Sequence, residues 1–398
     1  MAAEVQGSRT DSTSATPPWW RDERKRGLAA QILVGLILAL AVWFLISNML
    51  ANQERLGVPM SFRFLDTPAG FQLSFATISV TLDSPISRIL LVGALNTLLA
   101  SAITAVMATV LGVIIGIARL SNNWLISRLA GCYIEVLRNT PLLLQLVFWY
   151  SSVVAALPAV KSSLNLFNVI FLNKKGLYIP DPIFQPGAGA VLIALLVAIV
   201  LSVVLRRWAH KRQEATGQRF PAVAVSILLI LGLPALVSIA LGNPVEWDVP
   251  VLGGFNFSGG LAFQPEVVAL IVGLGLNSSA FIAEIIRGGI MAVSHGQTEA
   301  SLALGLKPRW ALRLVVIPQA QRIVIPPMVS QYLNVVKNST LAGFIGYPDL
   351  FSVIGTSQNQ TGRAVECIAI LMLFYLAVSL IISTILNWYN KRVALVER

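Results

Sequence analysis

The sequence predicts an all-α membrane protein with about eight transmembrane helices. Hydrophobic residues make up 56% of its 398 positions and charged residues only 12%, whereas soluble domains carry roughly 25% charged residues. Several apolar runs also reach the roughly 20 residues that a helix needs to cross a bilayer. The net charge of +11 comes from basic residues beside these runs. We therefore interpret it as a sign of membrane topology rather than of nucleic-acid binding.

The first apolar run follows a polar tail. Residues 1 to about 20 are rich in Ser, Thr and Ala, a composition that predicts disorder. Basic residues between Arg21 and Arg26 precede the apolar run from Gly27 to Leu50. A cleaved signal peptide is the alternative, but its apolar region normally has roughly 7–15 residues, and no A-x-A-like site stands out. We expect a retained helix with its N-terminus inside.

Seven further spans follow, separated by external and internal segments. They are expected at about Ile89–Ala118, Leu129–Leu157, Ala188–Leu205, Pro221–Leu241, Glu266–Ala292, Ile323–Ile345 and Ala364–Tyr389. The stretches before about residues 89, 188 and 266 are interpreted as external loops. Gly112 and Gly116 form a G-x-x-x-G in the second span. This spacing indicates close helix packing, and ordinary use of glycine in membrane helices explains it equally well.

Eight crossings would place both termini on the same side, and the positive-inside rule tests that arrangement. Nineteen Lys and Arg residues would lie inside, seven outside, and three within spans. This asymmetry supports cytoplasmic termini. Aromatic rings are favoured at membrane interfaces. We expect four of them there, namely Trp19, Trp20, Trp388 and Tyr389.

The segment Ser294–Pro318 would lie on the same cytoplasmic side. Ser294 and Gln297 have the S-x-x-Q spacing of a capping box, which predicts a short helix. Gly305 suits the left-handed position after the end of that helix. Pro308 suits the first turn of a second helix.

The first of these two short helices carries small residues that would let another surface approach it closely. They are Ala300, Ser301 and Ala303. The acidic Glu299 could meet a basic partner on that surface. An ordinary helical hairpin between two spans is the alternative.

Charged residues within the spans are expensive and therefore informative. Glu135 and Arg138 lie three residues apart, and so do Glu284 and Arg287. Residues at this spacing are neighbours on a helix, so each pair could neutralise itself. The alternative is a polar pathway, because an amino acid needs fixed partners of both signs.

Two further observations favour a polar pathway. Asn277, Phe281, Glu284 and Gly288 recur on one face of the sixth span. Lys337 stands in the seventh span without an acidic partner on the same helix, near Asn334. We expect it to pair with another helix or with bound solute.

The residue content argues against other kinds of site. Cys132 and Cys367 both fall in apolar stretches, and His210 and His295 are far apart. Neither a disulfide framework nor a histidine-based metal site is expected, and no catalytic residue is expected. The sequence contains no G-x-x-x-x-G-K-[S/T] phosphate loop, so ATP would bind another chain.

The segment Ser294–Pro318 resembles the signature of permease subunits of ABC importers. That signature is Glu-Ala-Ala, three residues, Gly, nine residues, Ile-x-Leu-Pro. Here it reads Glu299-Ala300-Ser301, then Gly305, then Val315-x-Ile317-Pro318, with intact spacing. The resemblance implies that Glu299, Ala300, Ser301, Gly305 and Pro318 belong to a coupling loop that docks on a separate ATPase subunit.

Other stretches resemble one branch of that family, the polar amino acid permeases. The branch pattern Glu-x-x-Arg-Gly-Thr-Pro-Leu-Leu is matched at residues 135–143, with Asn139 in place of Gly. Ala-Glu, two residues, Arg-Gly-Gly leading into Gly-Gln-x-Glu-Ala is matched at 283–300. The branch pattern Lys-Asp-Thr-Ser-Leu is matched at residues 337–341, where Asn338 stands in place of the Asp. The candidates for a substrate path are Glu135, Arg138, Thr140, Asn277, Glu284, Arg287, Asn334, Lys337 and Ser339.

The resemblance covers about residues 89–157 and 264–390 and implies a five-helix ABC importer (type I) permease core. The elongated layout is similar to the general L-amino-acid permeases of Gram-negative bacteria, and to the glutamate/glutamine/aspartate/asparagine permeases. It divides the chain into six parts. They are a cytoplasmic tail (1–27), an extra helix with a periplasmic segment (28–88), a first permease core segment (89–157), an insert with periplasmic loops and two extra helices (158–263), a second permease core segment with the coupling loop 294–318 (264–390), and another cytoplasmic tail (391–398).

The resemblance also implies partners. They are a cytoplasmic ABC ATPase dimer that binds ATP and Mg, a second permease subunit, a periplasmic amino-acid-binding protein, an L-amino acid and membrane lipid. The long-form resemblance favours a different chain over an identical one as the second permease. The expected location is the bacterial inner membrane. An ion-coupled secondary transporter, in which Glu284 or Lys337 takes up protons, is the first alternative, and a membrane enzyme is the second.

Overall fold

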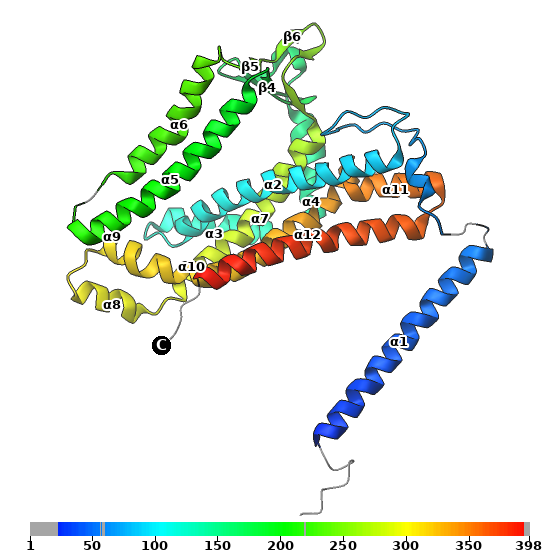
Figure 1. Cartoon of the computed structure of the whole chain (residues 1–398), viewed down its shortest axis with the longest axis horizontal. Coiled ribbons are helices and arrows are strands. Elements are labelled where there is room, and N and C mark those ends of the chain that lie inside the picture. Colours follow the sequence, from blue (N-terminus) through cyan, green and yellow to red (C-terminus); the bar gives the residue numbers. More distant parts are fainter. Residues whose placement is uncertain (1–22, 56, 58–59, 219, 394–398) are drawn as a thin grey trace, which may run out of the picture.

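The computed structural model describes residues 23–55, 57, 60–218 and 220–393. Within these ranges, six helices are long and apolar enough to cross a membrane. They are α1 (Glu23–Arg55), α2 (Ile86–Arg119), α5 (Ala188–Thr216), α6 (Ala222–Ala240), α7 (Pro265–Met291) and α12 (Ala364–Val393). Figure 1 shows α2, α7 and α12 running together in a bundle, whereas α1 lies apart from it. The predictions for the tail of residues 1–20, for Trp19 and Trp20 and for the side chain of Tyr389 fall outside what the structure describes.

The centre of the bundle is the contact between α2 and α7. A Cβ added to Gly112 of α2 would lie 2.5 Å from the side chain of Ile282. One added to Gly116 would lie 2.7 Å from the carbonyl oxygen of Ala283. The G-x-x-x-G pair therefore serves close helix packing, the first of the two explanations considered for it. The buried core around this contact includes Leu146, Leu270, Leu274, Val335 and Tyr347.

The third span is not the continuous helix over Leu129–Leu157 that the sequence predicted. α3 (Trp124–Asn139) ends before Pro141, and α4 (Leu142–Phe148) and the π-helical η2 (Trp149–Val154) follow it. Thr140 has φ −99° and ψ 131°, the extended backbone that a residue before proline prefers. Pro141 also has no N–H to continue the helical hydrogen bonds. The span is therefore broken.

The helix at the predicted seventh span begins earlier than predicted, and it is not among the six candidate membrane spans of the described residues. α10 (Ile317–Asn338) starts at Ile317 rather than at about Ile323. Pro318 stands in its first turn, directly after the π-helical segment Leu312–Val316. The chain then tightens into the 3₁₀-helix η5 (Ser339–Ile345) and continues after a short link as α11 (Leu350–Thr361).

A buried carboxyl caps α11. Asp349 is 0% exposed, and its Oδ1 accepts a hydrogen bond from the Ser352 N–H at 2.9 Å. Its Oδ2 has no partner among the residues described here. Asp349 lies outside the candidate membrane spans. Burial raises the pKa of this carboxyl to about 7, against the opposing effect of the Ser352 hydrogen bond.

The external insert contains short strands where the sequence analysis expected only loops. They are β1 (Leu164–Leu166), β2 (Ile170–Asn173), β3 (Gly176–Ile179), β4 (Asp181–Phe184), β5 (Val245–Asp248), β6 (Val251–Gly253), β7 (Asn256–Ser258) and β8 (Leu261–Phe263). All ladders are antiparallel, in a sheet of order β1-β2-β3-β8 and in the pairs β4-β5 and β6-β7. Strands of three or four residues are too short to show a clear alternation in sequence.

The strands join segments on both sides of the α5–α6 hairpin. β4 pairs with β5, so that Phe184 faces Val245, and β3 pairs with β8. Two short 3₁₀-helices also lie in external segments, η1 (Arg63–Asp66) and η3 (Val160–Ser162).

The helices α5 and α6 pack chiefly against each other and extend away from the bundle in Figure 1. α5 continues to Thr216, well beyond the predicted end at Leu205. The basic residues after Leu205 are good helix formers, and Gly217, with φ +71°, is the residue that ends the helix.

A short helical hairpin stands at one end of the bundle. It consists of α8 (His295–Ala303) and α9 (Pro308–Ala311), followed by the π-helical η4 (Leu312–Val316). In Figure 1 the turn between α5 and α6 points toward the same end, and α11 lies at the opposite end. The basic residues at the end of α5 and in the α8–α9 hairpin therefore lie toward the same end, whereas the basic start of α1 lies apart from it.

Candidate functional site

The hairpin α8–α9 begins as predicted but is capped differently. α8 follows Ser294, yet the Ser294 side chain makes no capping hydrogen bond. The predicted capping box is therefore wrong. The Gln297 side chain instead accepts a hydrogen bond from Gln319 Nε2 of α10 at 3.2 Å. This contact ties the hairpin to the helix that follows it in the chain.

The turn of the hairpin is a complete Schellman motif. Gly305 has φ +82°, as the sequence predicted. Its N–H donates to the Leu302 carbonyl at 2.9 Å, and the Leu306 N–H donates to the Ser301 carbonyl at 3.1 Å. Ser301 is buried, and its hydroxyl donates to the Thr298 carbonyl. The turn is thus fixed by its own backbone.

The outer face of the hairpin remains uncovered. The Glu299 side chain is 70% exposed and lies 3.0 Å from His295 Nδ1. Ala300 is exposed too, and Leu304 is 85% exposed beside Gly305. Pro318 lies away from this face, in the first turn of α10. The arrangement presents a carboxylate, a small residue and an apolar side chain on a rigid turn.

Leu304 was missed by the sequence analysis. Its position directly before Gly305, at the tip of the predicted hairpin, is the signal that could have found it. Here it is among the most exposed apolar side chains described. With Leu302, which is 42% exposed, it leaves apolar surface uncovered at this end of the hairpin.

A second group of candidates is brought together by α3 and α7. Asn277 Nδ2 donates to the Leu137 carbonyl at 3.0 Å, and the Arg138 guanidinium lies 5.3 Å from the ring of Phe281. The predicted face of α7 therefore turns toward α3.

Gln145, which the sequence analysis overlooked, holds the break in the third span. Its Nε2 donates to the carbonyls of Leu137 and Thr140 at 2.8 and 2.9 Å. Gln145 is 5% exposed, so this side chain satisfies carbonyls that the end of α3 leaves free. A glutamine inside an apolar run, just after a proline, is the signal that could have found it.

The two charged pairs behave differently despite their equal spacing. Arg287 Nε donates to Glu284 Oε2 at 2.9 Å, so that this pair neutralises itself. Glu135 instead accepts a hydrogen bond from Asn139 at 3.2 Å. Among the residues described, it forms no ion pair with Arg138. Self-neutralisation is therefore confirmed only for the α7 pair.

The remaining candidates lie on α10 and η5. Asn334 and Lys337 are exposed, and Lys337 forms no ion pair with any residue that the structure describes. Ser339 is buried, with its hydroxyl donating to the Val336 carbonyl. No hydrogen bond or ion pair among the described residues links this set to the α3–α7 set. Thr140 donates to the Val136 carbonyl at 2.7 Å.

The comparisons with known proteins decide the family. A family model described as "Binding-protein-dependent transport system inner membrane component" matches residues 190–395. The General L-amino acid transport system permease protein AapQ of Rhizobium johnstonii is 48% identical over 377 residues, which cover 95% of this chain and 94% of that protein. This chain belongs to the family of binding-protein-dependent transport system inner membrane components.

Two more relatives show how the members of this transport family differ in length. The Glutamate/glutamine/aspartate/asparagine transport system permease protein BztB of Rhodobacter capsulatus is 38% identical, over 95% of this chain and 96% of that protein. The Probable glutamine ABC transporter permease protein GlnM of Bacillus subtilis is 30% identical, over 52% of this chain but 85% of that protein. About half of this chain is therefore additional to what GlnM contains.

The family membership has two direct consequences. This inner membrane component is a membrane-embedded part of a transport system rather than a catalytic subunit. Neither the family nor these relatives point to the ion-coupled secondary transporter that the sequence left open.

Proposed function

We propose that this chain is the permease subunit of an ABC importer that moves L-amino acids across the bacterial inner membrane. The observation that carries the proposal is the exposed hairpin α8–α9, which presents Glu299 and Leu304 on a turn fixed by Gly305. The names of the relatives AapQ and BztB support amino acids as the substrate class. ATP and Mg would be held by a partner ATPase dimer, since the sequence has no phosphate loop.

The hairpin would transmit force between the two subunits. An exposed α8 with small residues can lie in a groove of the ATPase, and Leu304 would add apolar contact. Because Gln297 bonds Gln319, a displacement of α8 passes directly to α10. The α10 helix carries Lys337 and Asn334, so movement at the hairpin would reach the substrate path.

The exposed polar residues of α3 and α10 support a path shared with a second permease subunit. Glu135, Arg138, Asn334 and Lys337 are all exposed in this single chain. Polar side chains at membrane depth need polar surroundings, which a partner subunit and an aqueous path would supply. Charges of both signs suit a substrate that carries an ammonium and a carboxylate. The long-form layout favours a different chain as that partner.

The topology follows from the distribution of charge. The end of the molecule with α8 and the α5–α6 turn would face the cytoplasm, together with both termini. The strands β1–β8 and α11 would face the periplasm, where a binding protein delivers the amino acid.

The test is to isolate the full chain with its co-purifying subunits and to reconstitute them in vesicles. We expect an ATPase and a second permease among the partners, and uptake of labelled L-amino acids only with ATP and the binding protein. If vesicles that hold this chain alone accumulated amino acid without nucleotide, the proposal would be wrong.

A further inference from the structure

The cytoplasmic-side end of α5 has a chemistry that the transport role does not use. From Leu192 to Val204 the helix surface is dominated by exposed apolar side chains, and α6 is its chief packing partner. In a membrane these side chains contact acyl chains. The residues that follow on the same helix therefore lie where the lipid headgroups are.

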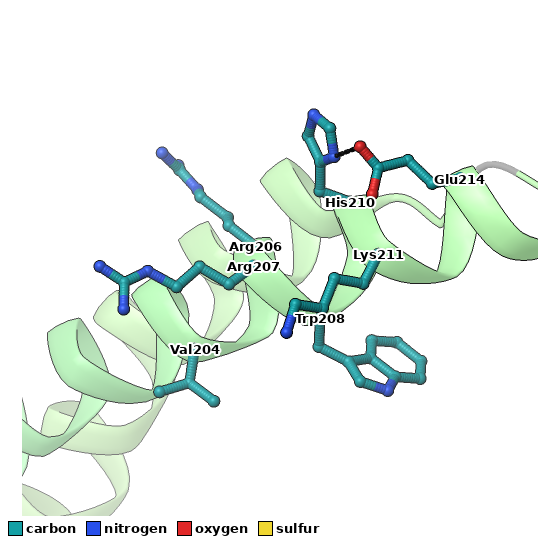
Figure 2. A pocket seen from close by; sticks show the side chains of 7 residues that line it. All are labelled: Val204, Arg206, Arg207, Trp208, His210, Lys211 and Glu214. Carbon is teal, nitrogen blue, oxygen red and sulfur yellow. Dashed lines mark ion pairs between the residues drawn. The ribbon is translucent and has the colours of Figure 1, made fainter.

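Basic side chains begin directly after this apolar surface. Arg206, Arg207 and Lys211, with Val204 and Trp208, line an open cleft of about 770 Å³. In Figure 2 Arg206 extends sideways from the helix, whereas Arg207 and Lys211 lean back along it toward Val204, and not out past its C-terminal end. This is the direction that helical side chains take, and it carries their charges toward the membrane.

The cleft keeps an excess of positive charge. Glu214 is the only acidic residue of α5, and its Oε1 lies 3.1 Å from His210 Nδ1. Within the residues that the structure describes, no carboxylate forms an ion pair with Arg206, Arg207 or Lys211. Three cations thus share the cleft with one carboxylate, Glu214, which pairs with His210 instead of with them.

An aromatic side chain is fixed at the edge of the cleft. The Trp208 ring meets Phe220 edge-on at 5.5 Å, and the Arg212 guanidinium lies 5.4 Å from it. Trp208 is 49% exposed. An indole held half-exposed beside an apolar helix surface is typical of the headgroup level of a bilayer.

We propose that the end of α5 binds the phosphate of an anionic phospholipid headgroup between Arg206, Arg207 and Lys211, with Trp208 packed beside the lipid. Guanidinium groups match phosphate oxygens in a bidentate manner. Each basic side chain near an anionic lipid surface raises the affinity about 5-fold. The bound lipid would anchor the free end of the α5–α6 hairpin in its leaflet.

The test uses the full-length chain in detergent, titrated with phosphatidylglycerol or phosphatidylcholine and read by native mass spectrometry. Wild type binds phosphatidylglycerol more tightly than phosphatidylcholine. The variant Arg206→Gln/Arg207→Gln/Lys211→Gln loses about 100-fold in affinity for phosphatidylglycerol. Arg206→Lys/Arg207→Lys loses less than the triple variant, because it keeps the charges but not the bidentate contacts. The charge-matched control Lys161→Gln/Lys174→Gln/Lys175→Gln, in the strand-bearing insert, binds as wild type does.

Four outcomes overturn the proposal. The triple variant at α5 could keep its affinity, or the control variant could lose as much. Millimolar inorganic phosphate could displace phosphatidylglycerol, which would indicate a site for free phosphate. The triple variant could instead lose the ATPase subunit on co-purification while it still binds lipid, which would indicate a protein contact. Should the triple variant misfold, the single variant Arg207→Gln still tests the site, with about a 5-fold loss expected.

Discussion

Gly116 of α2 faces Ala283 of α7 so closely that an added Cβ would lie 2.7 Å from the Ala283 carbonyl oxygen. Such an atom cannot be accommodated unless the two helices move apart, because the neighbour is backbone. This contact lies in the centre of the bundle, next to the helix that carries Asn277 and Glu284. Its closeness therefore positions one wall of the proposed substrate path.

We expect Gly116→Ala to destabilise the protein by about 1–3 kcal/mol, as overpacking of a core does. The control is Gly232→Ala in α6, where no atom lies within 4 Å of the added Cβ. That change should be neutral, or stabilising by up to about 1 kcal/mol, because alanine is the better helix former. Thermal unfolding of both variants in the same detergent makes the comparison. Equal midpoints for the two variants would contradict the packing argument.

The turn of the α8–α9 hairpin gives a second prediction. Gly305 has φ +82°, so Gly305→Val places a β-branched residue in the left-handed region at a cost of about 1–2 kcal/mol. We expect a distorted hairpin that hydrolyses ATP in the reconstituted importer without matching uptake. Gly305→Asn is the control, since asparagine tolerates this backbone and should keep most of the uptake. Normal uptake by the valine variant at normal expression would count against a role of this turn in coupling.

The exposed carboxylate of Glu299 on α8 gives a third prediction. Glu299→Lys should leave the fold intact, since the side chain is 70% exposed. It should lower ATP-driven uptake by about 10-fold or more through the loss of a charged contact. Glu246→Lys on β5, also exposed, is the matched charge reversal at the other end of the molecule and should transport normally. The measurement is uptake per co-purified ATPase, and equal uptake by the two variants refutes the docking of Glu299.

Lys337 tests the substrate path. We expect Lys337→Met to lower amino acid uptake by about 10-fold or more, because a charged partner of the substrate or of the second permease is lost. Assembly with the other subunits should be unchanged. Lys174→Met, in the insert, is the control. Unchanged substrate affinity and rate in the α10 variant would remove Lys337 from the path.

Asp349 predicts a pH dependence of stability. In the folded protein the Asp349 carboxyl, with its pKa raised to about 7, stays protonated up to about that pH. In the unfolded chain an aspartate loses its proton near pH 3.9. Between these values the folded state binds more protons, so the free energy of unfolding falls as pH rises, by up to about 1.4 kcal/mol per pH unit.

The variant Asp349→Asn removes this dependence and keeps a side chain that caps helices well. The melting midpoint of wild type, measured from pH 5 to pH 8, should therefore fall relative to that of the variant as pH rises. Parallel curves for the two proteins would show that Asp349 does not titrate in this range.

Sequence reasoning located most spans, because a membrane helix is encoded locally by the length of its apolar run. The starts of α5 and α7 were predicted to within a residue. The break at Pro141 was also encoded locally, by the preference of Thr140 for extended backbone, but the apolar run on both sides obscured it. The strands of the insert were not predictable, because β3 finds its partner β8 across the whole α5–α6 hairpin.

The charged pairs show why the site itself was only partly predictable. Glu284–Arg287 and Glu135–Arg138 have the same spacing, yet only the first forms an ion pair among the residues described. Arg138 lies over Phe281 of another helix, and Glu135 bonds Asn139 instead. Local spacing allows each pair either to neutralise itself or to contact other groups. The packing of α3 against α7 determines which of the two occurs for Glu135 and Arg138.

The pairing of β4 with β5 has a consequence for how such chains diversify. Phe184 and Val245 face each other in the ladder, and the Gln185 N–H donates to the Pro244 carbonyl at 2.9 Å. The sixty or so residues between them therefore leave and re-enter the protein at a single point. A segment with such closely spaced ends can be deleted and replaced by a tight turn, or inserted into a shorter permease. Neither change alters how the remaining helices are connected.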